Sequence, residues 1–283
     1  MRGMRSPPRE HWALPPRTHD ALKADERARL LELVRDVLSR PTAPYAEDLQ
    51  VRGVLAFAAA RPGIRARLDA HGNAILEWKG KRRRAPLAYS AHLDHPGVEL
   101  VGRVGRVGRA PVARLHGGVR ATALVDAPVR FFDTRDGRAI ATARVRTVRE
   151  RDLELTDVRG ELAPGAPGMW DLTPGRVRGT RLFARVCDDL LGAVAILFVL
   201  DRLWRERSDA GLIGVFTRAE ETGFVGCLGL LRTRALRRDT RVIGLECSPQ
   251  RASARPGRGA VVRVGDAASV FDPELSDALR SEE

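Results

Sequence analysis

The chain has 283 residues, 43% hydrophobic and 30% charged, which is the balance of a globular protein with room for one large α/β domain or two smaller ones. No apolar run approaches the roughly 20 residues needed to span a bilayer, and the N-terminus lacks the apolar core of a signal peptide, so we expect a cytoplasmic protein without a membrane partner. The net charge of +13 comes almost entirely from scattered arginines with few aromatic residues nearby, so we expect no nucleic-acid partner.

The N-terminal third predicts the start of an α/β domain. A Pro/Arg-rich flexible segment comes first, and apolar periodicity followed by turn residues then predicts two helices, a hairpin and a buried strand. These elements are expected at 1–17, 18–40, 47–60, 65–78 and 86–94.

The middle of the chain changes character. Short Val-, Thr- and Leu-containing runs are separated by Gly and Asp-Gly turns, without a helical pattern, and a Pro/Gly-rich stretch at 164–168 marks the return. Residues 96–172 are therefore expected to form an inserted, small, all-β domain that resembles a barrel.

From Thr180 the α/β pattern resumes. Helices are expected at 190–204, 226–236 and after Pro273, and strands at 212–217, 241–245 and 260–264. Residues 18–95 and 173–283 would together form one discontinuous α/β catalytic domain, with a mixed, mostly parallel sheet flanked by helices.

Acidic side chains and a histidine follow four apolar runs. The run at 86–94 carries His92 and Asp94, and the other three lead to Asp188-Asp189, Glu220-Glu221 and Glu246. In an open α/β sheet the carboxyl ends of the strands face one crevice, so these side chains are expected to meet there.

This set of residues fits a metal-dependent hydrolase. A catalytic metal takes His, Asp and Glu ligands, two neighbouring metals share a bridging carboxylate, and a general base must remain free. His92 can be a ligand, Asp94 can hold its other ring nitrogen, and Asp188 can bridge. Of Glu220 and Glu221, one can be the base and the other a ligand, and Glu246 completes the first site.

The motifs resemble those of the di-zinc aminopeptidases of the M42/M28 type, within the wider M20/M28/M42 metallopeptidase clan. The similarity covers roughly residues 20 to 275, and the β insertion also matches. The motifs that carry it are Ser90-Ala91-His92-Leu93-Asp94, Cys187-Asp188-Asp189-Leu190-Leu191-Gly192 and Ala219-Glu220-Glu221-Thr222-Gly223, with Glu246.

The resemblance implies a role for each residue and a zinc-peptidase-like fold. His92, Asp188 and Glu246 would hold one divalent metal, and Asp188 and Glu221 would hold a second; zinc is expected, with cobalt or manganese as alternatives. Asp94 would orient His92, Glu220 would be the general base, and the Asp188–Asp189 peptide bond would be cis. Many relatives have Asp at the position of Glu246.

The chain departs from the family in one respect. The family closes its second metal site with a histidine near the C-terminus, and no histidine follows Glu246 here. The chain would then be a truncated form or would lack one ligand, which leaves open whether the second site is occupied. His95 is expected to be a loop histidine rather than a substitute.

Three hypotheses remain. The first is a metal-dependent aminopeptidase or amide hydrolase, acting on a peptide or acyl-amino-acid substrate and assembled into a homo-oligomer through the β insertion. The second is a catalytically impaired relative that serves as a subunit or binding module. The third, supported only by the net charge of +13, is a nucleic-acid-binding protein.

Overall fold

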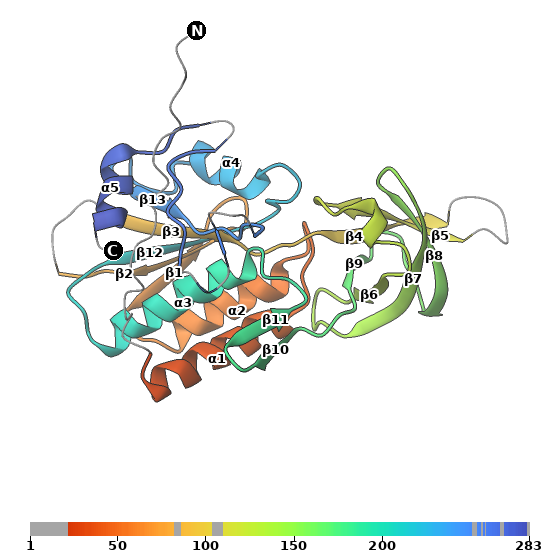
Figure 1. Cartoon of the computed structure of the whole chain (residues 1–283), viewed down its shortest axis with the longest axis horizontal. Coiled ribbons are helices and arrows are strands. Elements are labelled where there is room, and N and C mark those ends of the chain that lie inside the picture. The colour runs from red at the N-terminus through yellow and green to blue at the C-terminus, as the bar shows by residue number, and fades with distance from the viewer. Residues whose placement is uncertain are drawn as a thin grey trace, which may run out of the picture. The chain divides into compact units, whose positions relative to one another are not determined.

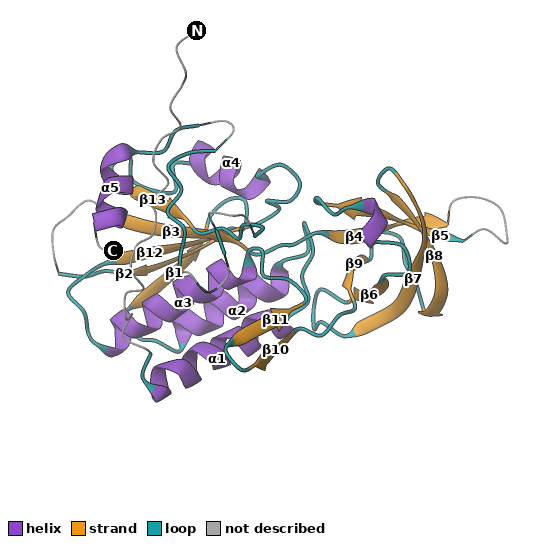
Figure 2. Cartoon of the chain, viewed as in Figure 1, coloured by secondary structure: helices purple, strands orange, loops and turns teal. Residues whose placement is uncertain are grey.

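A computed structural model describes residues 22–81, 86–103, 110–250, 254–255, 257, 259–266 and 269–281 (Figures 1 and 2). The chain divides into two compact units. One is Arg29–Cys247, and the other combines Met1–Ala28 with Ser248–Glu283. The flexible segment expected at 1–17 lies outside the described residues.

A five-stranded mixed sheet organises the larger unit. Its strands follow the order β1 (Ile64–Leu68), β2 (Ala74–Trp78), β12 (Leu212–Thr217), β3 (Leu87–His92) and β13 (Arg241–Gly244). The β12–β3 and β3–β13 pairings are parallel, and the other two are antiparallel. The sheet is therefore mixed, as expected, without a majority of parallel pairings.

The register of the parallel strands aligns their carboxyl ends. Thr217 of β12 pairs with His92 of β3, and Gly244 of β13 pairs with Ser90. The segments that follow these three strands consequently leave the sheet at the same edge, which is where the sequence places its acidic residues.

Helices cover both faces of this sheet. These helices are α1 (Ala24–Ser39), α2 (Asp48–Ala59), α3 (Leu190–Arg205) and α4 (Val225–Arg232). A further helix, α5 (Pro273–Ser281), belongs to the smaller unit. Side chains of α1, α2 and α3 share one core with alternate residues of the strands, such as Leu76 and Phe216, while Leu230 of α4 packs on Ile75 and Val215 on the opposite face (Figure 1). No described helix is long and apolar enough to cross a membrane.

Residues 97–170 contain a closed six-stranded barrel. Its strands are β4 (Gly97–Arg103), β5 (Pro111–His116), β6 (Pro128–Phe132), β7 (Ala139–Arg149), β8 (Asp152–Gly160) and β9 (Pro167–Trp170), in the order β4-β5-β8-β7-β6-β9. A short 3₁₀ turn (η1, Ala121–Ala123) lies between β5 and β6. The barrel has its own apolar core, which includes Val129, Phe131 and Leu153. Its independence as a domain with the boundaries 96–172 stays a prediction.

Several expected elements were wrong or missed. Strand β9 at Pro167–Trp170 was not predicted, because the sequence shows there the end of a Pro/Gly-rich stretch, and the strand closes the barrel between β4 and β6. A two-stranded ribbon, β10 (Gly175–Arg178) and β11 (Arg181–Ala184), was not predicted. The strand expected at 260–264 is absent from the described structure, where this region contributes only an isolated bridge between Gly265 and Val270.

His95 lies on the short connection between β3 and β4 and is fully buried. Its Nδ1 is 2.9 Å from the carbonyl oxygen of Pro96, and its Nε2 has no partner among the described residues. Burial lowers the pKa of His95 from its ordinary 6.5 to about 4. The residue is therefore neutral in the folded protein near neutral pH, with Nδ1 as the protonated nitrogen.

The buried His95 is expected to make stability depend on pH. Its folded pKa lies below its unfolded pKa, so the unfolded state takes up the proton first, and stability is lost as the pH falls from about 6.5 to about 4. The full shift corresponds to about 3 kcal/mol. Urea unfolding of the wild type and of His95→Gln at pH 7 and at pH 4.5 measures it: the wild type should lose more stability than the variant between the two. Equal losses would contradict the assignment.

A matched pair of leucines tests the core. Leu200 of α3 is fully buried, whereas Leu231 of α4 is 65% exposed. Leu200→Ala should lower the free energy of unfolding by about 2–5 kcal/mol, because it removes packed methyl groups and leaves a cavity. Leu231→Ala should change it by less than about 0.5 kcal/mol. Denaturant unfolding compares the two, and similar losses would mean that the layering described above is wrong.

Candidate metal centre

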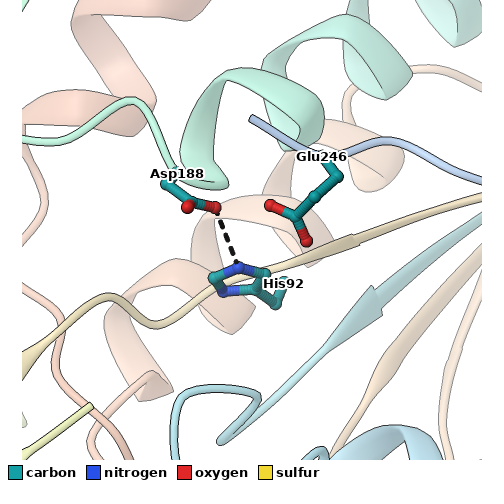
Figure 3. A group of neighbouring side chains, drawn as sticks. All are labelled: His92, Asp188 and Glu246. Carbon is teal, nitrogen blue, oxygen red and sulfur yellow. Dashed lines mark ion pairs between the residues drawn. The ribbon is translucent and has the colours of Figure 1, made fainter. Parts of the chain in front are cut away.

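Three segments bring a histidine and two carboxylates together at the carboxyl edge of the sheet. His92 ends β3, Asp188 precedes α3, and Glu246 follows β13. One ligand atom of each lies within 4.8 Å of the others (Figure 3). His92 Nε2 is 3.3 Å from Asp188 Oδ1. We expected all four apolar runs to be strands of the sheet, and for residues 184–189 this was wrong. This segment follows the separate β10–β11 ribbon, and Asp188 reaches the site from a loop.

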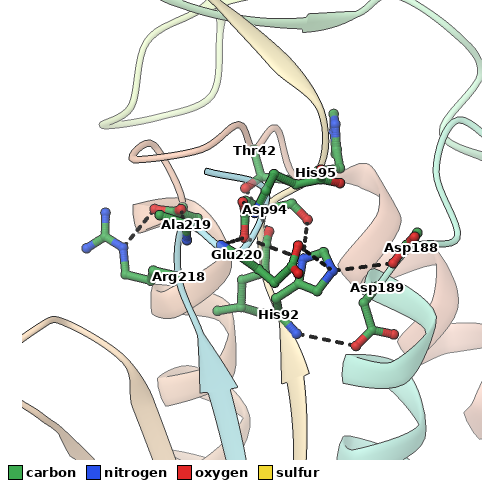
Figure 4. Close-up of polar contacts among 12 residues, drawn as sticks. Thr42, His92, Asp94, His95, Asp188, Asp189, Arg218, Ala219 and Glu220 are labelled. Carbon is green, nitrogen blue, oxygen red and sulfur yellow. Dashed lines mark hydrogen bonds and ion pairs between the residues drawn. The ribbon is translucent and has the colours of Figure 1, made fainter. Parts of the chain in front are cut away.

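Asp189 fixes the loop that carries Asp188. Its buried carboxylate accepts a hydrogen bond from Gly192 N at 3.2 Å, which caps α3, and another from His92 N at 3.3 Å (Figure 4). The Asp188–Asp189 peptide bond is cis, as the resemblance implied. Asp189 thus ties the start of α3 to the end of β3, a role that its pairing with Asp188 in the sequence did not reveal.

The electrostatics of this group suit a cation. Burial opposes a charge on His92, but the carboxylates of Asp188 and Asp94 outweigh it and raise the pKa of His92 to about 11. Burial and the neighbouring Asp188 raise the pKa of Glu246 to about 8. Asp188 Oδ1 is buried, and among the described residues its partner is His92 Nε2 at 3.3 Å. One imidazole nitrogen and two carboxylate oxygens that crowd together in this way form a possible site for a divalent metal.

Asp94 lies beside His92 and makes two kinds of contact. His92 Nδ1 is 3.0 Å from the backbone carbonyl oxygen of Asp94 and 3.4 Å from its Oδ1. The Asp94 carboxylate also accepts hydrogen bonds from Glu220 N at 3.0 Å and Glu221 N at 3.1 Å (Figure 4). The expected contact with His92 is present, and the contacts with the loop after β12 are an additional finding.

The two glutamates of that loop point in different directions. Glu220 Oε2 lies 3.7 Å from His92 Nε2, and burial raises the pKa of Glu220. Glu221 Oε2 instead accepts a long hydrogen bond of 3.4 Å from Gly118 N of the segment after β5, and burial raises the pKa of Glu221 to about 7. The structure therefore gathers His92, Asp188, Glu246 and Glu220, and turns Glu221 aside.

Two further histidines do not enter the group. The ring of His95 points away from His92 in Figure 4. His116 Nε2 pairs with Glu99 at 3.0 Å, and its ring meets that of Tyr45 edge-on. Sequence reasoning missed Glu47, which is fully buried and contacts the loop before Glu220. A glutamate at the start of an expected helix carries no signal that separates it from an ordinary surface acid.

One family model covers the part of the chain that carries four of the candidate site residues. Residues 151–281, which include Asp188, Glu220, Glu221 and Glu246, match the family model described as M42 glutamyl aminopeptidase. No curated protein sequence matches the chain.

Solved structures share the fold. The TET1 peptidase of Pyrococcus horikoshii aligns with a TM-score of 0.72 at 18% identity, over 89% of this chain and 80% of that chain. An aminopeptidase from the archaeon Desulfurococcus kamchatkensis gives 0.70 at 18% identity, over 90% and 77%. A TET aminopeptidase from a marine-sediment Thaumarchaeota archaeon gives 0.71 at 14% identity, over 89% and 78%. The resemblance drawn from the motifs is thereby confirmed over residues 151–281, which match the M42 family model, and the solved structures show that most of the chain shares the fold of these peptidases.

Proposed function

We propose that this protein is a metal-dependent hydrolase of the aminopeptidase type. The observation that carries the proposal is the convergence of His92, Asp188 and Glu246 within 4.8 Å, with the Glu220 carboxylate beside them. The M42 match and the aminopeptidases among the structural relatives support the same reaction class. The substrate would be a peptide or an acyl-amino acid.

His92 Nε2 and the carboxylates of Asp188 and Glu246 would hold one divalent cation, with zinc proposed and cobalt or manganese as alternatives. The chemistry that a metal held by these residues would supply is a lower pKa of a bound water and polarisation of the scissile carbonyl. Asp188 and Glu221 would contribute to a second site. For that, the Glu221 carboxylate would have to leave Gly118 N.

Glu220 would move the proton. Its Oε2 would accept a proton from the attacking water and later deliver it to the nitrogen of the leaving amine as the C–N bond breaks. Because burial raises the pKa of Glu220, its carboxylate is better matched to giving the proton back near neutral pH than an exposed glutamate would be. Asp94 would keep both His92 and the Glu220 backbone in place through the contacts described above.

A homo-oligomer is part of the proposal. The Pyrococcus horikoshii TET1 peptidase is described as assembling into a tetrahedron or an octahedral shell. We propose that residues 96–172 of this chain act as an inserted domain that contacts neighbouring copies. The α/β domain of 18–95 and 173–283 would carry the site, in a cytoplasmic protein without a nucleic-acid or membrane partner.

A catalytically impaired protein is the second candidate. The observation that favours it is the direction of Glu221, which lies with Gly118 N and not with His92, Asp188 and Glu246. Such a protein would bind one metal ion per chain and act as a subunit or binding module.

Replacing the proposed base should abolish turnover without affecting metal binding. Glu220→Gln is expected to lower kcat by about 10²–10⁴, because the amide cannot accept the proton. Hydrolysis of aminoacyl-anilides with added zinc, cobalt or manganese measures it, and Asp239→Asn, at an exposed ion pair with Arg237, is the control. Absence of turnover in the wild type with all three metals would reject the enzymatic proposal for this chain.

Metal stoichiometry separates the two candidates. Elemental analysis after loading should give two ions per chain for the two-metal enzyme and one for the impaired relative. Glu246→Gln should lower the affinity for the ion held by His92, Asp188 and Glu246 by at least about 10-fold, since even the loss of a contact that supports a ligand lowers metal affinity by about 10–100-fold. Glu221→Gln should leave that ion in place and remove only the second. Tight zinc binding that survives Glu246→Gln unchanged would place the metal elsewhere.

A further inference from the structure

The loop that carries Glu220 is fixed in place through hydrogen bonds from its backbone N–H groups. Four consecutive backbone N–H groups after β12 donate to three side chains, which come from different parts of the larger unit. The pairs are Arg218 N with Asn73 Oδ1 at 3.0 Å, Ala219 N with Glu47 Oε1 at 2.8 Å, Glu220 N with Asp94 Oδ1 at 3.0 Å, and Glu221 N with Asp94 Oδ2 at 3.1 Å.

The hydrogen bond from Ala219 N to Glu47 lies at a residue with an unfavourable backbone conformation. Ala219 has φ of 50°, in the left-handed region that a residue with a side chain rarely adopts. Such a conformation persists only when the surrounding structure holds it. Ala219 is also directly before Glu220, so its backbone angles set the direction in which the Glu220 side chain leaves the loop.

Glu47 is built for this contact. Its side chain is fully buried, and it receives Ala219 N at 2.8 Å and Tyr45 N at 2.9 Å on Oε1, and Arg218 Nε at 2.7 Å on Oε2. Three donors converge on two oxygens, which requires a side chain that only accepts. A glutamine would turn its NH₂ group toward one of those donors.

Glu47 stands at the N-cap position of α2, yet its side chain makes no capping hydrogen bond to that helix. The carboxylate reaches across to the β12 loop instead, over a sequence separation of 172 residues. Because Glu47 makes no capping hydrogen bond to α2 and instead binds the residue before Glu220, we infer that its side chain stabilises the loop and not the helix.

We propose that Glu47 is a positioning residue: it holds Ala219 in its left-handed conformation and thereby directs the Glu220 carboxylate toward His92. It does not touch the substrate. This inference rests on the role of Glu220 under the proposed function, whereas the hold on the loop can be measured without any activity.

The alternative is that Glu47 merely contributes a buried ion pair to stability. Asp201 provides the matched control. It is 4% exposed and receives Arg61 Nε and Arg205 Nε, both at 2.8 Å, within the helical layer and without a contact to the β12 loop. Asp201→Asn and Glu47→Gln therefore remove the same kind of buried charge, and only the second puts an NH₂ group where a loop residue needs an acceptor.

The experiment compares the full-length wild type, Glu47→Gln, the milder Glu47→Asp and Asp201→Asn. Hydrogen exchange over 218–221, followed by mass spectrometry, should speed up by about 10-fold or more in Glu47→Gln, because the loop loses a restraint. Its kcat for an aminoacyl-anilide should fall by about 10–100-fold, since a misplaced reacting group costs about that much. Its KM and zinc content should stay within about 2-fold of the wild type. Glu47→Asp, too short to bridge Ala219 N and Arg218 Nε together, should shift exchange and kcat in the same direction by less.

Asp201→Asn should lower the thermal midpoint while leaving exchange over 218–221 and kcat per folded molecule unchanged. Wild-type exchange at 218–221 in both Glu47 variants would overturn the inference, as would an equal effect of Asp201→Asn. A proportional loss of zinc would overturn it as well, because Glu47 would then support the metal ligands and not Glu220. If the wild type has no turnover, the proposed function fails, and the exchange measurement still decides whether Glu47 holds the loop.

Discussion

The site depends on one buried carboxylate, that of Asp94. Its two oxygens receive the backbone N–H groups of Glu220 and Glu221, while its backbone carbonyl meets His92 Nδ1. The ends of β3 and β12 are thus joined beyond the last pair of their parallel ladder, Thr217 and His92. A carboxylate with 0% exposure is costly unless its oxygens accept hydrogen bonds, and here the donors belong to the loop that carries Glu220 and Glu221. The same hydrogen bonds at Asp94 therefore both stabilise its buried carboxylate and position the loop of Glu220 and Glu221.

Much of the fold followed from local patterns. The hairpin, the helix from 190 and the strand at 212–217 have apolar periodicities and turn residues that few alternatives satisfy, and the structure has them at almost the expected bounds. The elements that failed are those whose existence depends on a distant partner. Strand β9 contains Pro and Gly and is a strand because β4 and β6 flank it, whereas the Val-rich residues 260–264 have strand propensity and, among the described residues, no neighbouring strand to pair with.

The candidate site shows the same division. Residues at strand ends, such as His92 and Glu246, were predictable because the carboxyl edge of a sheet is a geometric consequence of strand direction. The position of Asp188 was not predictable, because it lies in the loop before α3 and a loop has no hydrophobic periodicity. The direction of Glu221 was not predictable either, because its contact with Gly118 N joins residues that are 103 positions apart in the sequence. The tasks of Asp189 and Glu47 depend on contacts across 97 and 172 positions of sequence.

The short connection between β3 and β4 has a consequence for protein engineering. An inserted domain is usually tied to its host by solvated linkers that tolerate extra residues. Here Leu93, Asp94 and His95 are buried, and the chain passes within a few residues from the sheet into the first barrel strand. A fusion or barrel exchange cut at this junction would disturb three consecutive buried residues, Leu93, Asp94 and His95. Grafts should therefore keep 92–97 intact and be joined within the barrel, since the boundary drawn by sequence pattern at 95/96 lies directly after these buried residues.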